Sequence, residues 1–160
     1  MSRKRINRTV KALKVIDINS NGMGVAKSKK GAVYFIKNVV PGDIVDVQIY
    51  KKRRGFFEAE PLNWVETSID RTNPPCDHFG VCGGCKWQHL SYAAQLRFKE
   101  KGVLHNLIHI GKIETHQVLP ILGAENPYFY RNKMEFSFSN KRWLTPQEIK
   151  EEKEIERDGL

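Results

Sequence analysis

Cysteine is scarce in this sequence, and so are long apolar runs. Only three of the 160 residues are cysteine, and an odd number argues against a disulfide framework. No apolar run approaches the roughly 20 residues that a membrane span requires, so we expect no membrane partner. No secretory leader is visible, and we therefore expect a reducing, cytoplasmic environment.

Acidic residues are also scarce, but only in the first part of the chain. Residues 1–60 contain 14 Lys and Arg against 5 Asp and Glu, whereas residues 61–160 contain 13 of each kind. The whole formal net charge of +9 therefore lies in the first part. A positive charge concentrated in this way indicates an anionic partner such as nucleic acid.

The same first part has the pattern of short strands separated by turns. Extended segments are predicted at Val10–Ile18, Ala32–Ile36, Ile44–Ile49 and Phe56–Trp64, with turn signals at Asn21-Gly22 and Pro41-Gly42. The alternation of apolar residues is imperfect in the first segment and regular in the third. Short strands at this spacing predict a small OB-like β-barrel over residues 1–66.

Barrels of this kind bind nucleic acid by combining cations with a few exposed aromatic rings. The candidate RNA-binding residues are Lys29, Lys30, Lys51, Lys52, Arg53, Arg54 and Phe56, and the arm Arg3–Arg5 adds positive charge. The competing interpretation is that the charges only solvate the barrel and the aromatic rings fill it.

The three cysteines fall within ten residues, at Cys76, Cys82 and Cys85. The pair Gly83-Gly84 allows a positive φ where the backbone must fold back for the thiolates to converge. Thiolates suit an iron–sulfur cluster or Zn²⁺, and either normally takes a fourth ligand. His78 or His89 could supply that ligand to zinc, while the remaining alternative is that the cysteines are buried apolar residues without function.

Residues 67–75 look like a linker because they are polar and end in Pro74-Pro75. Beyond the cysteines, Ser91 is predicted to N-cap a helix that ends at Gly111. The apolar stripe of this helix consists of Leu96, Val103, Leu107 and Ile110.

Two further elements are predicted near the end of the chain. Residues Tyr128–Ser139 alternate between apolar and polar side chains, which is typical of a half-buried strand. Thr145-Pro-Gln-Glu148 has the form of a capping box, although few apolar residues follow it.

Several of these segments together resemble one family. The segment Cys82–Leu96 is similar to the cluster motif of the bacterial RNA uracil-C5 methyltransferases. The segments Asn21-Gly-Met-Gly-Val-Ala, Val39-Val-Pro-Gly-Asp and Phe56-Phe-Glu-Ala resemble the TRAM domain that begins the 23S rRNA members, and Tyr128–Ser137 resembles the strand that opens their central domain. The matches cover roughly residues 9–140.

The resemblance implies a fold and a set of ligands. It implies a TRAM barrel over residues 1–66, then, over residues 76–160, the cysteine loop, a helix and the first strands of an incomplete central α+β domain. Cys76, Cys82 and Cys85 would bind a 4Fe-4S cluster with a fourth ligand from outside this chain, and His89 would hydrogen-bond locally rather than ligate metal. The partner would be ribosomal RNA, and we expect a monomer.

The resemblance also implies an enzyme that uses S-adenosylmethionine. A cysteine of such enzymes attacks C6 of uracil, so that C5 can take the methyl group, and a glutamate removes the C5 proton. This chain has no cysteine left for that role and no Gly-rich loop for the methyl donor. We therefore expect the catalytic and donor-binding residues beyond Leu160, and the 160-residue chain to be inactive alone.

Two other classes remain open at this point. One is an RNA-binding adaptor with a structural zinc. The other is the radical methylthiotransferases, whose TRAM domain is generally C-terminal and whose motif is Cys-x3-Cys-x2-Cys. Here the barrel comes first and the first gap has five residues, and both features disagree with that family.

Overall fold

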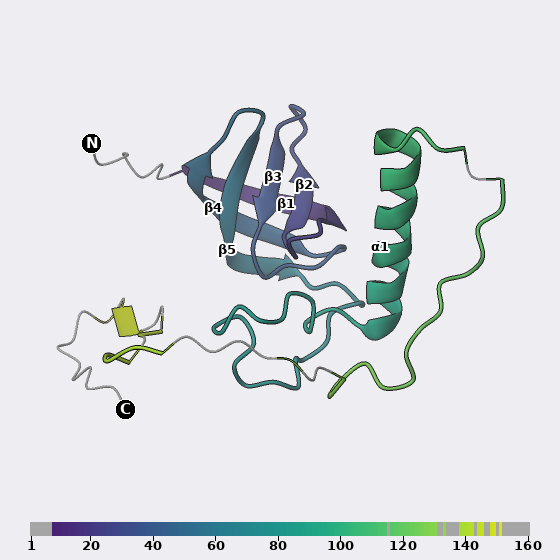
Figure 1. Ribbon diagram of the computed structural model, residues 1–160. Coiled ribbons are helices and arrows are strands. Elements are labelled where there is room, and N and C mark those ends of the chain that lie inside the picture. Colours follow the sequence, from purple (N-terminus) through teal and green to yellow (C-terminus); the bar gives the residue numbers. More distant parts are fainter. Residues whose placement is uncertain are drawn as a thin grey trace.

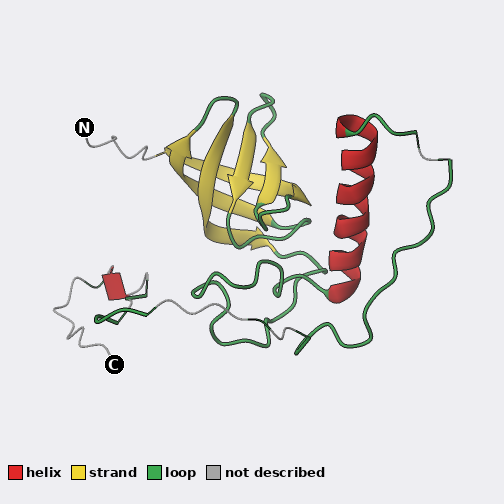
Figure 2. Cartoon of the chain, in the orientation of Figure 1, coloured by secondary structure: helices red, strands yellow, loops and turns green. Residues whose placement is uncertain are grey.

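Five strands form a closed barrel in the first part of the chain (Figure 1). The computed structural model describes residues 8–114, 116–130, 133, 138–142, 144–145, 148–149 and 151. Within them the strands are β1 (Arg8–Ile18), β2 (Gly24–Lys27), β3 (Val33–Ile36), β4 (Ile44–Lys52) and β5 (Phe56–Glu66). The α-helix α1 (Tyr92–His105) and the π-helix η1 (Asn106–Ile110) follow, so strands and helices occupy separate parts of the chain (Figure 2). The predicted OB-like barrel is confirmed.

The barrel closes in the order β1-β2-β3-β5-β4. Neighbouring strands pair antiparallel, except that β3 and β5 are parallel. The sequence did not predict β2, because its four residues begin with Gly24 and give too short an alternation. Gly24 is required there by packing, since a Cβ on it would lie 2.4 Å from Cγ2 of Val39.

The barrel core is apolar and follows the alternation of the strands. Its fully buried cluster consists of Leu13, Val15, Ala26, Tyr34, Ile36, Val39, Val45, Val47, Ile49 and Ala59. The regular third segment of the sequence supplies three of these residues from β4. Burial of such side chains provides the main stabilisation of the barrel.

A bulge explains why β1 alternates imperfectly. The register with β4 shifts between Val10 and Leu13, and Ala12 has a φ of 51°. The Asp46 carboxylate accepts a hydrogen bond from the Ala12 N–H at 2.8 Å, which satisfies a group that the bulge removes from the ladder. A second shift lies between Val15 and Asp17. After each bulge, the apolar side chains of β1 point into the barrel again.

The parallel pair gives the barrel two different ends. Val33 pairs with Phe56 where β3 and β5 begin, so the β2–β3 and β4–β5 turns lie at the same end (Figure 1). We call this the basic end, because its turns carry Lys29, Lys30 and Lys51–Arg54. The opposite end, formed by residues 19–23 and 37–43, contacts the later part of the chain, and we call it the docked end.

A buried carboxylate holds the docked end together. Asp43 is fully buried, and it accepts hydrogen bonds from the backbone N–H of Val40 and of Ser68, each at 2.9 Å, and from the guanidinium of Arg71. Burial alone would raise the pKa of Asp43, but the hydrogen bonds from Arg71, Val40 and Ser68 outweigh it and hold that pKa below its usual range. The turn in front of Asp43 is the predicted one, with Gly42 at a φ of 97°.

Residues 67–75 connect the barrel to the helix through defined contacts. Arg71 forms a β-bridge with Leu90, and the Thr72 N–H donates to the His89 carbonyl at 3.0 Å. The Ser91 N–H donates to the Asp70 carbonyl at 2.8 Å. The segment predicted as a linker therefore has little regular structure but is fixed to both neighbours, which the polar composition did not reveal.

Helix α1 begins where the sequence predicts. The Ser91 hydroxyl caps it by accepting the Ala94 N–H at 3.4 Å, and η1 extends it to Gly111. That glycine has a φ of −73°, and the left-handed residue that follows the helix is Lys112, with a φ of 53°. The expected left-handed glycine at position 111 was therefore wrong by one residue.

The predicted apolar stripe of this helix is only partly buried. Ala94 is the buried residue of α1, and it packs with Val40, Leu90, Trp87 and Phe98. Val103 and Ile110 are 58% and 74% exposed, so the stripe does not mark a face that is buried along its whole length. The first turns of α1 supply its apolar contacts with the docked end, and further along the helix Lys101 pairs with Asp17 of β1 at 2.6 Å.

The predicted strand Tyr128–Ser139 is not formed where the structure describes it. Tyr128–Tyr130, Lys133, Phe138 and Ser139 are outside any strand, and the other positions of that segment lie outside the described residues. A strand without a neighbour leaves its backbone groups unpaired, which explains the absence at the described positions. The arm Arg3–Arg5 also lies outside the described residues.

The capping box is confirmed. The Thr145 N–H donates to the Glu148 carboxylate at 2.7 Å, and the Glu148 N–H donates to the Thr145 hydroxyl at 3.3 Å. Arg142 and the Thr145 N–H lower the pKa of Glu148 to about 2.

Among the described residues, no helix has the length and apolar character needed to cross a membrane.

We predict that Asp43→Ala lowers the free energy of unfolding by about 3–5 kcal/mol, because it leaves the Arg71 guanidinium and two backbone N–H groups without their acceptor. Urea unfolding followed by circular dichroism measures this. Glu60→Gln is the control, because it removes an exposed carboxylate that pairs with Lys37 at 2.9 Å, and it should cost about 1 kcal/mol or less.

The pH dependence of Asp43 has a defined sign. Since its folded pKa is lowered, its contribution is fully present above the ordinary carboxyl pKa of about 3.9 and is lost as the pH falls through the folded value. The stability gap between the wild type and Asp43→Asn should therefore narrow in acid. A gap that stays constant from neutral pH to pH ~2 would contradict the assignment.

Candidate nucleic-acid interface and cysteine loop

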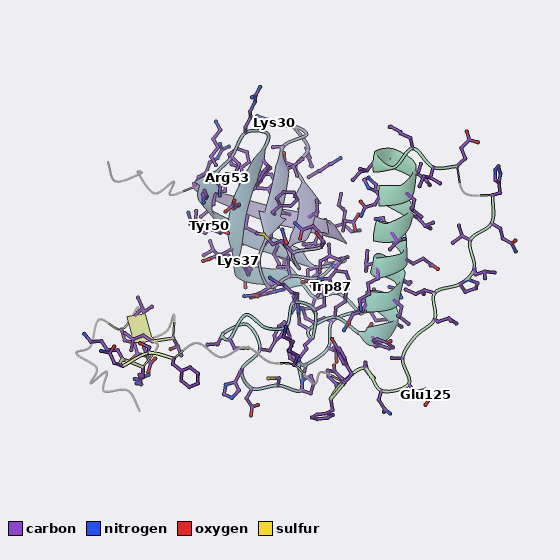
Figure 3. All side chains as sticks on the ribbon, viewed as in Figure 1. Lys30, Lys37, Tyr50, Arg53, Trp87 and Glu125 are labelled. Atoms are coloured by element: carbon purple, nitrogen blue, oxygen red, sulfur yellow. The ribbon has the colours of Figure 1, made fainter. Side chains whose placement is uncertain are left out.

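The parallel pairing of β3 and β5 brings two basic turns together. Lys29 and Lys30 lie in the turn after β2, while Lys51–Arg54 lie at the end of β4 and in the turn after it. Lys27 pairs with Val33, which pairs in turn with Phe56, so segments more than twenty residues apart meet at the basic end. Figure 3 shows Lys30 and Arg53 there.

Most of the predicted cations at this end are available to a ligand. Lys29, Lys30, Lys52 and Arg54 are exposed and Lys51 is partly exposed, and none of the five forms an ion pair with a described residue. Arg53 differs, because its Nε lies 2.8 Å from the Glu58 carboxylate and lowers the pKa of that group. The RNA contacts themselves stay predictions.

The aromatic residues of β3 and β5 divide into two pairs. Tyr34 and Phe57 stack inside the barrel with ring centroids 5.3 Å apart. Phe35 and Phe56 lie on the other faces of their strands, with centroids 4.7 Å apart, and both are partly exposed. The interpretation that aromatic rings fill the barrel therefore holds for the first pair only. Phe35 was not among the predicted contacts, although its position between two inward residues indicates the outer face.

The charged groups of Lys37 and Glu60 are paired with one another on the side of the barrel. The Lys37 ammonium lies 4.6 Å from the centre of the Tyr50 ring and 2.9 Å from the Glu60 carboxylate, and Figure 3 shows Lys37 and Tyr50 near one another. The hydrogen bond to Glu60 raises the pKa of Lys37, and burial raises that of Tyr50. Lys37 is thus engaged within the protein.

The cysteine loop lies at the docked end. Gly22, in the turn between β1 and β2, has a φ of 77°, and a Cβ on it would lie 2.8 Å from Cβ of Lys86. Trp87 packs in the cluster at the start of α1 and lies between barrel and helix in Figure 3. This close approach gives a physical reason for Gly22 in the Asn21-Gly-Met-Gly segment. The cysteine loop and the basic turns therefore lie at opposite ends of the barrel.

Tight turns shape the tip of the loop. The Phe79 N–H donates to the Cys76 carbonyl at 3.0 Å, and the Cys82 N–H donates to the His78 carbonyl at 3.1 Å. Gly83 has a φ of 73°, as the sequence predicted for the Gly83-Gly84 pair, but the positive angle is confined to the first of the two.

Two of the three sulfur atoms receive hydrogen bonds. The Gly84 N–H donates to Cys82 Sγ at 3.5 Å, and Gln88 Nε2 donates to Cys85 Sγ at 3.1 Å. Such donors, and three soft ligands on one loop, fit an iron–sulfur cluster in their chemistry. In the part of the chain that the structure describes, no three His, Cys, Asp or Glu side chains are grouped to hold a metal ion. The metal assignment stays a prediction.

His89 is buried beside this loop. Its Nε2 donates to the Val39 carbonyl at 3.3 Å, and its ring centroid lies 5.1 Å from that of Phe79. Burial lowers the pKa of His89, which favours the neutral ring. His89 therefore forms a hydrogen bond, but its partner lies 50 residues away and is not local as expected. Its Nδ1 has no hydrogen-bond partner among the described residues.

Comparison with known proteins places the barrel among described domains. Residues 4–62, which include the barrel strands up to β5, match the TRAM domain family. Along most of its length the chain is also a relative of proteins named as RNA methyltransferases.

Three such relatives illustrate the match. A Bacteroides thetaiotaomicron protein named an uncharacterized RNA methyltransferase is 50% identical over 133 residues, covering 83% of this chain and 29% of that protein. One of the same name from Porphyromonas gingivalis is 43% identical, covering 87% and 30%. The 23S rRNA (uracil(1939)-C(5))-methyltransferase RlmD of Xylella fastidiosa is 38% identical, covering 88% and 31%. The chain spans about three tenths of the length of these curated relatives.

We predict that Gly22→Ala destabilises the protein more than Gly31→Ala. Both glycines have a positive φ, 77° and 80°, so both substitutions introduce backbone strain of about 1 kcal/mol. Only Gly22 is crowded, by Lys86 and Trp87, whereas Gly31 has no atom within 4 Å of its added Cβ. The clash should add about 1–3 kcal/mol, as measured by urea unfolding. Equal losses for the two variants would show that the cysteine loop does not press against this turn.

Proposed function

We propose that this chain is the N-terminal, RNA-binding and iron–sulfur part of an S-adenosylmethionine-dependent 23S rRNA uracil-C5 methyltransferase. The observation that carries the proposal is the similarity to proteins named RNA methyltransferases, RlmD among them, over more than four fifths of the chain. The match includes the TRAM domain and extends well beyond it, so the barrel alone does not account for it.

The basic end supplies the RNA-binding role in this proposal. Lys29, Lys30, Lys51, Lys52 and Arg54 would neutralise phosphates, with release of counterions, while Phe56 would contact a base. Arg53 would join them only by leaving Glu58, since that pair already lies at 2.8 Å. These cations give affinity and position rather than sequence specificity.

The cysteine loop supplies the cluster-binding role. Cys76, Cys82 and Cys85 would be three of the four ligands of a 4Fe-4S cluster, with the fourth from another part of the whole protein. Such a cluster, when bound, supplies either a rigid cross-link or a redox centre. The Gln88 side chain and the Gly84 N–H would donate hydrogen bonds to the ligand sulfurs of Cys85 and Cys82. Thiolate clusters persist in a reducing cytoplasm, which is where we place the protein.

Catalysis would belong to the rest of the whole protein. All three cysteines of this chain are assigned to the loop, and none is left to attack a uracil base. The chain would bind and position RNA and have no methyltransferase activity alone. Its oligomeric state is proposed to be monomeric.

We predict that the 160-residue chain binds RNA with a strong dependence on salt. About five phosphate contacts give a slope of log K against log[salt] of about −3.5, measured by fluorescence anisotropy with a ribosomal RNA fragment. Lys29→Ala/Lys30→Ala should make the slope shallower by about 1.4. Lys86→Ala/Lys99→Ala removes the same charge from the cysteine loop and α1 and should leave the slope unchanged. Affinity that does not respond to salt would remove the RNA-binding role.

We also predict that anaerobic reconstitution with iron and sulfide gives a chain with broad visible absorbance that is lost in air. The colour should be weak, because one ligand is missing, and Cys82→Ser should abolish it. In a parallel measurement, the same chain is expressed in zinc-rich medium and its zinc and iron contents are determined. One tightly held zinc per chain, without iron uptake, would favour the adaptor with a structural zinc, for which the unpartnered Nδ1 of His89 offers a fourth ligand.

A further inference from the structure

Phe35 and Phe56 form an aromatic patch on the outside of the barrel. Tyr34 and Ile36 on β3 and Ala59 on β5 point into the core, so alternation places Phe35 and Phe56 on the outer face. Their centroids are 4.7 Å apart and their planes are inclined by 58°. Neither ring is needed to fill the barrel, because Tyr34 and Phe57 do so.

The patch lies next to the basic end. Phe56 pairs with Val33, which pairs with Lys27, so two strand spacings, about 10 Å, separate Phe56 from that lysine. On the other side, Lys51 of β4 pairs with Glu58, which points outward as Phe56 does. The rings are therefore bordered by cations from both sides.

The acidic neighbours of the patch are neutralised within the protein. Glu58 pairs with Phe35 across the strands, and its carboxylate is held by Arg53 at 2.8 Å. Glu60 is held by Lys37 at 2.9 Å. Negative charge beside the rings is thus compensated, while Lys29, Lys30, Lys51, Lys52 and Arg54 remain without a described ion-pair partner.

This combination selects one kind of ligand. The core of a protein–protein interface is depleted of charged residues, whereas this patch is surrounded by uncompensated cations. Single-stranded nucleic acid presents phosphates to cations and base faces to aromatic rings. The bases of a duplex are stacked on one another and do not offer their faces.

We propose that Phe35 and Phe56 form a stacking platform for unpaired bases of single-stranded RNA, whose flanking phosphates contact the basic turns. The inference rests on the proposed RNA-binding function and adds the strandedness of the ligand and a residue, Phe35, to its site. One base would stack on a ring face while the inclined second ring contacts its edge. The barrel would then prefer a loop or an unpaired segment of ribosomal RNA to a helix.

The test compares a single-stranded RNA 12-mer carrying 2-aminopurine with a 12-base-pair RNA duplex, both with the full chain. Stacking should quench the 2-aminopurine fluorescence, and the single strand should bind about tenfold more tightly. Phe56→Leu and Phe35→Leu keep an apolar side chain without a flat ring, and each should lose about tenfold in single-strand affinity with an unchanged salt slope. Phe56→Tyr keeps the ring and should retain quenching. Urea midpoints confirm that each variant is folded.

The outcomes separate the two proposals. If both RNAs bind with the expected salt slope but the Leu variants match the wild type, the platform is wrong and RNA binding by the basic end stands. If neither RNA binds the wild-type chain, both proposals fail. If Phe56→Leu and Phe35→Leu change the self-association of the chain, measured by light scattering, but not its affinity for single-stranded RNA, the patch is a protein contact and the platform is overturned.

Discussion

The buried Asp43 carboxylate is the interaction on which the arrangement of this chain depends. It lies in the turn before β4, and it accepts hydrogen bonds from the backbone N–H groups of Val40 and Ser68 and from the guanidinium of Arg71. One carboxylate therefore ties the barrel to the segment that leads to the cysteine loop. A buried charge is tolerated only when it is paired and fully hydrogen-bonded. The polar composition of residues 67–75 thus reflects attachment to the barrel rather than freedom from it.

The strand order separates two tasks along the barrel. Because β3 and β5 run parallel, both basic turns leave at one end, and both connections that meet the cysteine loop leave at the other. The basic turns and the thiols are consequently separated along the barrel, and the apolar cluster around Trp87 and Leu90 lies at the end away from those turns. An RNA that touched both ends would have to extend along β4, whose nine residues span about 30 Å.

Local patterns in the sequence predicted most of the barrel and the helix start, since alternation in Ile44–Ile49 and the Ser91 cap depend on nearby residues. Features that depend on distant residues escaped prediction. Strand β2 is too short to show a period, and Arg71 gave no sign of its partner 28 residues away. The strand at Tyr128 followed a clear alternation, but a strand needs a neighbour as well as a pattern. The outward pair Phe35–Phe56 required the register of two parallel strands, which periodicity alone does not give.

The cysteine loop is anchored at its ends and open at its tip, and this bears on how it would take a metal. The bridge from Arg71 to Leu90 and the hydrogen bond from His89 to Val39 fix its base, while Cys82 and Cys85 are exposed. Ordering a free ten-residue segment would cost about 10–20 kcal/mol, comparable to the roughly 10–16 kcal/mol that a complete structural zinc site returns. Anchoring removes part of that cost, because the turns at Phe79 and Cys82 already exist. Binding of a metal would then require only that the three thiol groups converge, and a fourth ligand would add to the free energy of binding.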